Sequence, residues 1–168
     1  MSERFGTLRC DFALGAAALG FACATGYNSV VAVRDKVPGE PLGIAIPLSV
    51  PTGILVGWGS AVSAPWPMPV AALIAAFRQV KGKGVVGPAL VCAGLGVAGI
   101  VGILIEPNTY KTQSWTPAVR RTVVAHIVTS ATLAGVGMWH LRRSECESTS
   151  GASASKQWPR LRSGSVPL

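Results

Sequence analysis

Long uncharged stretches separated by short charged segments dominate this sequence. Runs free of Asp, Glu, Lys and Arg cover residues 12–33, 41–77, 85–105 and 122–141. A helix that crosses a bilayer needs about 20 consecutive, predominantly apolar residues. The runs lack the amphipathic period of a helix on a soluble protein. The pattern predicts an all-α integral membrane protein, a bundle of four transmembrane helices.

Three of the runs have the length of one span each, which predicts spanning helices over 12–33, 85–105 and 122–141. A cleaved signal peptide is the alternative for the first, because Arg4 and Arg9 precede it and Ala22-Cys23-Ala24 has the form of a cleavage site. The apolar run continues to Val33. That length exceeds a signal-peptide core and favours a span.

The run over 41–77 is too long for one ordinary helix and short for two helices with a loop. The Pro65-Trp66-Pro67-Met68-Pro69 stretch divides it, because proline disrupts a helix interior. We predict a second span over Leu42–Ser63, kinked by its two prolines, and then a short interfacial helix from about Val70 to Phe77. Two tight spans, five in all, are the alternative.

Basic residues set the predicted orientation. With four spans, ten of the 15 Lys and Arg residues lie on the side of the two termini. These ten are Arg4, Arg9, Arg78, Lys81, Lys83, Arg142, Arg143, Lys156, Arg160 and Arg162. Positive charge accumulates on the cytoplasmic side, so both termini are predicted to be cytoplasmic. Five spans would instead place Arg142 and Arg143 outside.

The net charge of +8 changes this picture little. The basic residues fall between the apolar runs and form no single stripe, so we expect the lipid bilayer as the partner and no nucleic acid. The abundance of Ala, Gly and Val, and the excess of Arg over Lys, suit a GC-rich genome, and we expect a bacterial plasma membrane. Residues 144–168, rich in Ser, Gly and Ala, are predicted to form a disordered basic cytoplasmic tail.

No motif in the sequence indicates a cofactor, a metal site or a known catalytic centre. The four cysteines, Cys10, Cys23, Cys92 and Cys146, have neither Cys-x-x-Cys spacing nor a His pair at ligand intervals. The sequence also lacks zinc-protease, nucleophile-elbow and phosphate-loop motifs. We therefore expect neither a metal nor a cofactor, and an enzyme is not favoured.

Polar residues near the outer ends of the spans form the candidate site, a polar pocket of Asn28, Glu106 and His126. Ionisable groups inside a membrane are functional candidates because burying them is costly. Two other interpretations remain open. Glu106 can pair with Arg120 or Arg121 at the interface, and Asn28 and His126 can be hydrogen-bonding residues that hold helices together.

Small residues spaced by four occur in every predicted span, and such stripes let helix backbones approach closely. They are Ala16, Gly20 and Ala24; Gly53, Gly57 and Ala61; Gly94, Ala98 and Gly102; and Ala131 and Gly135. These stripes favour a tight bundle and a non-enzymatic assembly or accessory protein, as a homo-oligomer or within a larger membrane complex. A small transporter or ligand-binding protein that uses the pocket is the alternative. A membrane enzyme would need His126 and Glu106 within hydrogen-bond reach.

Overall fold

The computed structural model describes residues 2–44, 47–56, 59–110 and 115–155, without the side chains of 2–11, 41, 108 and 145–155. The described part of the chain is all-helical and has no strand, which confirms the predicted class. Its five α-helices are α1 (Ser2–Arg34), α2 (Val50–Val56), α3 (Pro67–Val80), α4 (Val86–Ile105) and α5 (Pro117–Ser155). Two short 3₁₀ helices, η1 (Pro41–Gly43) and η2 (Pro107–Tyr110), lie in the connections.

Three of these helices are long and apolar enough to cross a membrane. The apolar segments are Phe12–Arg34 in α1, Val86–Ile105 in α4 and Pro117–Ser144 in α5. They match the spans predicted over 12–33, 85–105 and 122–141. Large apolar side chains such as Leu19, Leu90 and Val128 are more than half exposed along them. Apolar surface of this extent is typical of helices that face lipid, so the fold indicates a membrane protein.

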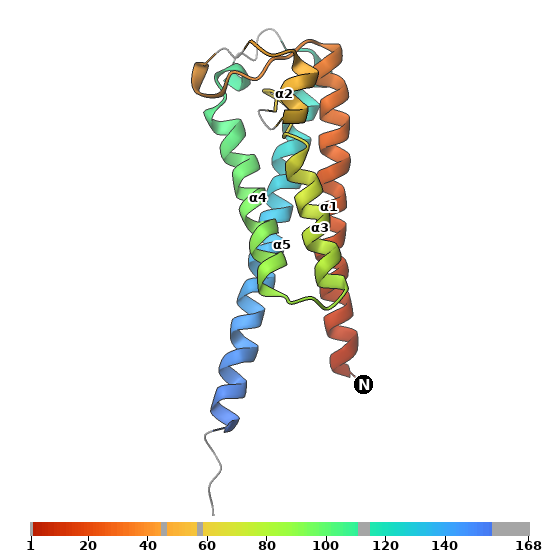
Figure 1. Cartoon of the computed structure of the whole chain (residues 1–168), viewed down its shortest axis with the longest axis vertical. Coiled ribbons are helices and arrows are strands. Elements are labelled where there is room, and N and C mark those ends of the chain that lie inside the picture. The colour runs from red at the N-terminus through yellow and green to blue at the C-terminus, as the bar shows by residue number, and fades with distance from the viewer. Residues whose placement is uncertain (1, 45–46, 57–58, 111–114, 156–168) are drawn as a thin grey trace, which may run out of the picture.

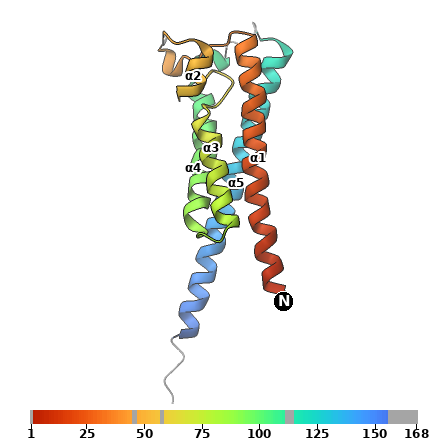
Figure 2. The same cartoon turned by 45° about the vertical axis from the view of Figure 1, so that its right-hand side comes forward.

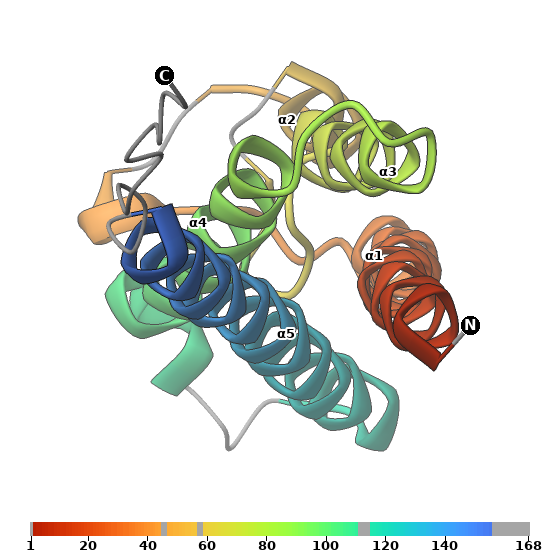
Figure 3. The same cartoon turned by 90° about the horizontal axis from the view of Figure 1, so that it is seen from below.

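Helices α1, α3, α4 and α5 form an antiparallel ring in which α3 and α5 each pack against both α1 and α4 (Figure 3). The start of α1 and the end of α5 lie at the same end of the bundle, which we call the lower end (Figures 1 and 2). The turn between α3 and α4 is also there. The connection from α1 to α3, with α2, covers the upper end.

The predicted second span over 42–63 is wrong, because these residues do not form one helix. Only α2, seven residues long, lies within this range. Gly59 has a φ of +70°, and a Cβ there would lie 2.7 Å from the Ser63 carbonyl oxygen. Proline removes backbone donors and glycine disfavours helix, so a segment rich in both bends instead of crossing as one rod.

The predicted interfacial helix from Val70 to Phe77 is longer than expected and belongs to the bundle. It begins at Pro67, since proline is tolerated in the first helical turn, where its missing N–H has no partner to lose. Ala72 and Ala76 are buried and allow close packing. With 14 residues, α3 is about 21 Å long by the helical rise, shorter than a spanning helix.

The last helix extends further than the sequence predicted. Its backbone stays helical to Ser155, although we expected disorder from Ser144 onward. Extending an existing helix avoids the cost of nucleating a new one, which explains why these polar residues can remain helical. The rest of the predicted disordered tail, residues 156–168, lies outside the described residues.

Close backbone packing joins α4 and α5, but through other small residues than those predicted. A Cβ at Gly96 would clash with the Ala134 backbone nitrogen, and one at Gly137 with Ala89 and Ala93. The stripes predicted in α1, α4 and α5 begin on the outside, where Gly20, Gly94 and Gly135 are exposed. Residues four apart drift by about 40° around a helix, so these stripes do not follow the buried face.

Replacing Gly137 by Ala should lower the thermal unfolding temperature in mild detergent, followed by circular dichroism. The new Cβ would lie 2.6 Å from the Ala93 nitrogen and 2.8 Å from the Ala89 oxygen. Overpacking costs about 1–3 kcal/mol and outweighs the helix-propensity gain of about 1 kcal/mol. Gly135→Ala, with nothing within 4 Å of its Cβ, is the control and should not destabilise the protein. Equal unfolding temperatures for the two variants would contradict this packing.

Candidate functional site

A layer of buried polar residues separates two apolar clusters in the bundle core. The lower cluster includes Leu14 and Phe21 of α1 and Leu133 of α5. The upper one includes Val31 of α1 and Val119 of α5. Between these positions along the two helices lie the buried side chains of Thr25, Asn28, His126 and Ser130. Asn28 and His126, two of the three predicted site residues, therefore lie in one buried polar layer.

The connecting segment, residues 59–66, continues the line of α3 toward the upper end without being helical. Its backbone is paired locally, with Ser60 N donating to Ser63 O at 3.0 Å and Ser63 N to Ser60 O at 3.3 Å. Trp66 N donates to Ile54 O at 3.0 Å. Residues 61–64 are buried. These bonds fix a short non-helical element against the helices.

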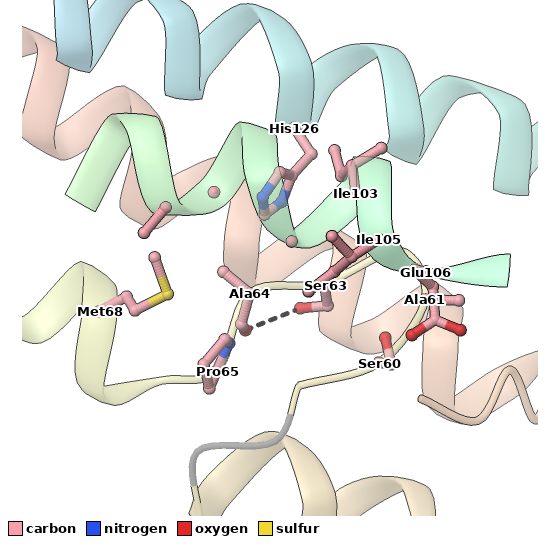
Figure 4. Close-up of a pocket in the computed structure, with 13 residues that line it drawn as sticks. Ser60, Ala61, Ser63, Ala64, Pro65, Met68, Ile103, Ile105, Glu106 and His126 are labelled. Carbon is pink, nitrogen blue, oxygen red and sulfur yellow. Dashed lines mark hydrogen bonds between the residues drawn. The ribbon is translucent and has the colours of Figure 1, made fainter. Parts of the chain in front are cut away.

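Serine hydroxyls fasten the connecting segment to α1. The Ser63 hydroxyl lies 3.0 Å from that of Ser29 and 3.4 Å from the carbonyl oxygen of Thr25. Ser29 in turn donates to the Thr25 carbonyl at 2.8 Å. The Ala64 carbonyl oxygen, 3.2 Å from the Ser63 hydroxyl, is an alternative acceptor for its single hydrogen (Figure 4). Ser29 and Ser63 therefore hold the connecting segment against α1.

A cavity of about 250 Å³ lies between the connecting segment and the upper half of α4. Its walls are mostly apolar and small, and its polar side chains are two serines, Glu106 and His126 (Figure 4). The lining residues are Ser60, Ala61, Ser63, Ala64, Pro65, Met68, Ala98, Gly99, Gly102, Ile103, Ile105, Glu106 and His126. Because α3 begins only at Pro67, none of the described helices takes its place in this part of the bundle.

His126 of α5 lines the cavity beside the upper half of α4 (Figure 4). It is 3% exposed, and its ring meets that of Phe21 edge to face, with centroids 5.9 Å apart. The ring also contacts the backbone of Gly99, where a Cβ would lie 3.3 Å from Nε2. Nδ1 is buried and forms no hydrogen bond with a described residue. His126 thus combines a fixed ring with a polar atom that has hydrogen-bonding capacity.

Glu106 ends α4 and lies at the upper end of the cavity, near Ser60 and Ala61 (Figure 4). It is 5% exposed, and both its carboxylate oxygens accept from the Glu40 backbone N–H, at 3.1 Å each. Since Nδ1 of His126 has no hydrogen-bond partner among the described residues, it does not pair with this carboxylate. An ion pair between Glu106 and Arg120 or Arg121 stays a prediction.

Asn28 is fully buried but is not among the residues that line the cavity. Neither its amide nitrogen nor its amide oxygen has a hydrogen-bond partner among the described residues. The structure therefore brings Glu106 and His126 to one cavity and leaves Asn28 beside it in the polar layer. The walls formed by the connecting segment do not follow from the sequence pattern, which predicts a helix over 42–63.

Comparisons of the chain with protein-family models, curated proteins and solved structures give no match.

Ser63→Ala should lower the free energy of unfolding by about 1 kcal/mol, the typical net value of a buried hydrogen bond. The change removes the contacts of Ser63 with Ser29 and Thr25 that hold the connecting segment to α1. Denaturant titration in detergent, followed by circular dichroism, measures the effect. The control is Ser144→Ala, because among the described residues that hydroxyl bonds only the Leu141 carbonyl in its own helix. Similar losses in both variants would contradict a fastening role for Ser63.

Proposed function

We propose that this protein binds a small, largely apolar molecule in the membrane. The observation that carries the proposal is the cavity of about 250 Å³ that contains Glu106 and His126. A cavity of about 150 Å³ accommodates benzene, so this one has room for a somewhat larger molecule. Apolar walls with a few placed polar groups are typical of ligand sites.

The lining predicts the chemistry of the ligand. Ala64, Met68 and Ile103 offer apolar contact, and the His126 ring, which lines the cavity, would offer one nitrogen for a hydrogen bond. A carboxylate at the upper end, Glu106, disfavours an anion there. The best match is an apolar body of one or two rings, or a short branched chain, that carries a hydroxyl or another neutral polar group.

The ligand would enter from the flank of the bundle. Among the lining residues, Ala98, Gly102 and Ile105 are exposed on the outer side of α4. In a membrane this side faces lipid, where apolar molecules concentrate. An exchange site of this kind suits a carrier or a sensor, and it requires no chemical reaction.

We further propose that the chain crosses the membrane four times, with both termini in the cytoplasm. The third helix and the connecting segment together would make the second crossing. Non-helical backbone is tolerated at membrane depth where protein buries it, and residues 61–64 are buried. The lower end, which carries Arg78, Lys81 and Lys83, would then face the cytoplasm according to the positive-inside rule.

Self-assembly is a second candidate function, and the outward position of small-residue stripes favours it. Ala16 and Gly20 of α1, and Gly94, Ala98 and Gly102 of α4, are exposed. Small residues at such spacing let helices of two chains pack closely in lipid. A homo-oligomer or a complex with another membrane protein would cover these faces.

Gly102→Leu should weaken binding of 1-naphthol, an apolar two-ring probe with one hydroxyl, by about tenfold or more. Gly102 lines the cavity, and its Cβ would meet nothing within 4 Å, so leucine would fill the space without disturbing the bundle. Filling a site removes apolar contact, and tenfold corresponds to about 1.4 kcal/mol. Equilibrium dialysis of purified protein in mild detergent measures the affinity.

The control is Gly94→Leu, which is on the same face of α4, equally unobstructed and outside the cavity. It should change 1-naphthol binding less than twofold. A second variant, His126→Phe, keeps an aromatic ring but should remove the preference for 1-naphthol over naphthalene. No binding by the wild type, or equal affinities for wild type and Gly102→Leu, would refute the ligand-binding proposal.

Oxidation should link two copies of the protein through Cys23 if α1 forms the assembly contact. Cys23 is exposed next to the small-residue stripe of α1, whereas Cys92 is buried. The experiment uses a variant with Cys10→Ala and Cys146→Ala, in which Cys23 is the accessible thiol among the described cysteines. A disulfide requires Cα atoms within about 7 Å. Copper-phenanthroline treatment of membranes and gel electrophoresis detect the dimer.

Adding Gly20→Leu should suppress this cross-link, because the bulkier side chain separates the two helices. The cross-link must also disappear when Cys23 is changed to Ser. A protein that stays monomeric at every oxidant concentration would argue against assembly through α1.

A further inference from the structure

A second open groove of about 420 Å³ lies at the lower end, between α3 and α4. Its walls are mostly apolar or small and are formed by Ala71, Ile74, Ala75, Gly84, Gly87, Pro88 and Val91. Ile74 and Val91 are 57% and 43% exposed. It is separate from the upper cavity, with which it shares no lining residue.

Basic side chains line the end of this groove where the chain turns from α3 to α4. Arg78 and Lys83 are both exposed and both line the groove. The neighbouring Lys81 lies over the Phe77 ring, 5.3 Å from its centroid. Neither Arg78 nor Lys83 forms an ion pair with a described residue. Among the residues whose side chains are described, the turn therefore presents positive charge without an acidic partner beside an apolar groove.

Acidic side chains are far from this turn in the part of the chain whose side chains are described. Asp35, Glu40 and Glu106 all belong to the upper end of the bundle. Two glycines with positive φ, Gly82 at +69° and Gly84 at +87°, make the tight turn that sets Lys83 beside Arg78. Lys83 N also donates to the Arg78 carbonyl at 3.0 Å. The backbone thus holds the two basic residues together.

We infer that this groove binds one anionic phospholipid, with its phosphate on Arg78 and Lys83 and an acyl chain along Ile74 and Val91. Charge complementarity selects the headgroup, because basic residues beside a membrane attract anionic lipid. The apolar walls select the chain. A soluble anion would use only the basic end and leave the groove uncovered, so both features together match a lipid.

The test is native mass spectrometry of the full-length protein in mild detergent, with phosphatidylglycerol or phosphatidylcholine of identical acyl chains added. Phosphatidylglycerol should be retained several-fold more. Arg78→Gln with Lys83→Gln should reduce its retention about tenfold, since each basic residue contributes to attraction of anionic lipid. The matched control, Arg120→Gln with Arg121→Gln at the upper end, should change it less than twofold.

Gly87→Leu tests the apolar half without changing charge, because Gly87 lines the groove and a Cβ there meets nothing within 4 Å. It should also lower phosphatidylglycerol retention, whereas Gly94→Leu, outside the groove, should not. Circular dichroism must show that all variants remain folded. Equal retention of the two lipids would overturn the inference. A second set of results would also overturn it: the charge-neutralised variant loses phosphatidylglycerol, Gly87→Leu retains it, and inorganic phosphate displaces it. The site would then bind a headgroup alone.

Discussion

The structure depends on how the fourth element of the bundle is completed, because its helix, α3, is shorter than the bundle. Helix α3 covers about 21 Å, and the connecting segment supplies the remaining height as non-helical backbone. Its N–H and carbonyl groups must find partners, because burying them unpaired is costly in a bundle core. The Ser60–Ser63 bridge and the Trp66 bond to Ile54 supply part of this pairing. Ser29 of α1 supplies an anchor through its contact with Ser63, and the cavity beside α4 is the space that a full helix would have filled.

Much of this fold follows from the length of apolar runs, and the rest does not. The three long spans were predictable because each needs only about 20 apolar residues, a property of composition within a window. The 41–77 run was different, since proline and glycine leave several backbone paths open and only contacts with other helices choose one. Gly59, with its φ of +70°, is where the chain departs from the predicted helix. The assignment of Pro67 to a helix start could have been made from its tolerance at the first turn.

The candidate site was predictable in depth but not in membership. Asn28, Glu106 and His126 are all shielded from solvent, with 0%, 5% and 3% exposure, whereas the sequence left open that Glu106 lies at the interface. Which of them share a cavity depends on helix rotation and on the connecting segment. Residues spaced by four rotate gradually around the helix axis. The stripe that begins at the exposed Ala16 and Gly20 therefore reaches the buried side of α1 at Asn28. Residues spaced by four therefore share one face of a helix over about two turns, but not over longer stretches.

Ala98 and Gly102 belong both to the outer stripe of α4 and to the mouth of the upper cavity. A helix of a second protein molecule that packs on this stripe would cover the opening of the cavity. Occupancy of the cavity and crowding of the protein in its membrane would then compete for one surface, as reciprocal linkage requires. A bound molecule that protrudes would hold two copies apart, and a dense array of copies would trap molecules already inside. The local abundance of the protein would thereby regulate exchange without a dedicated regulatory domain.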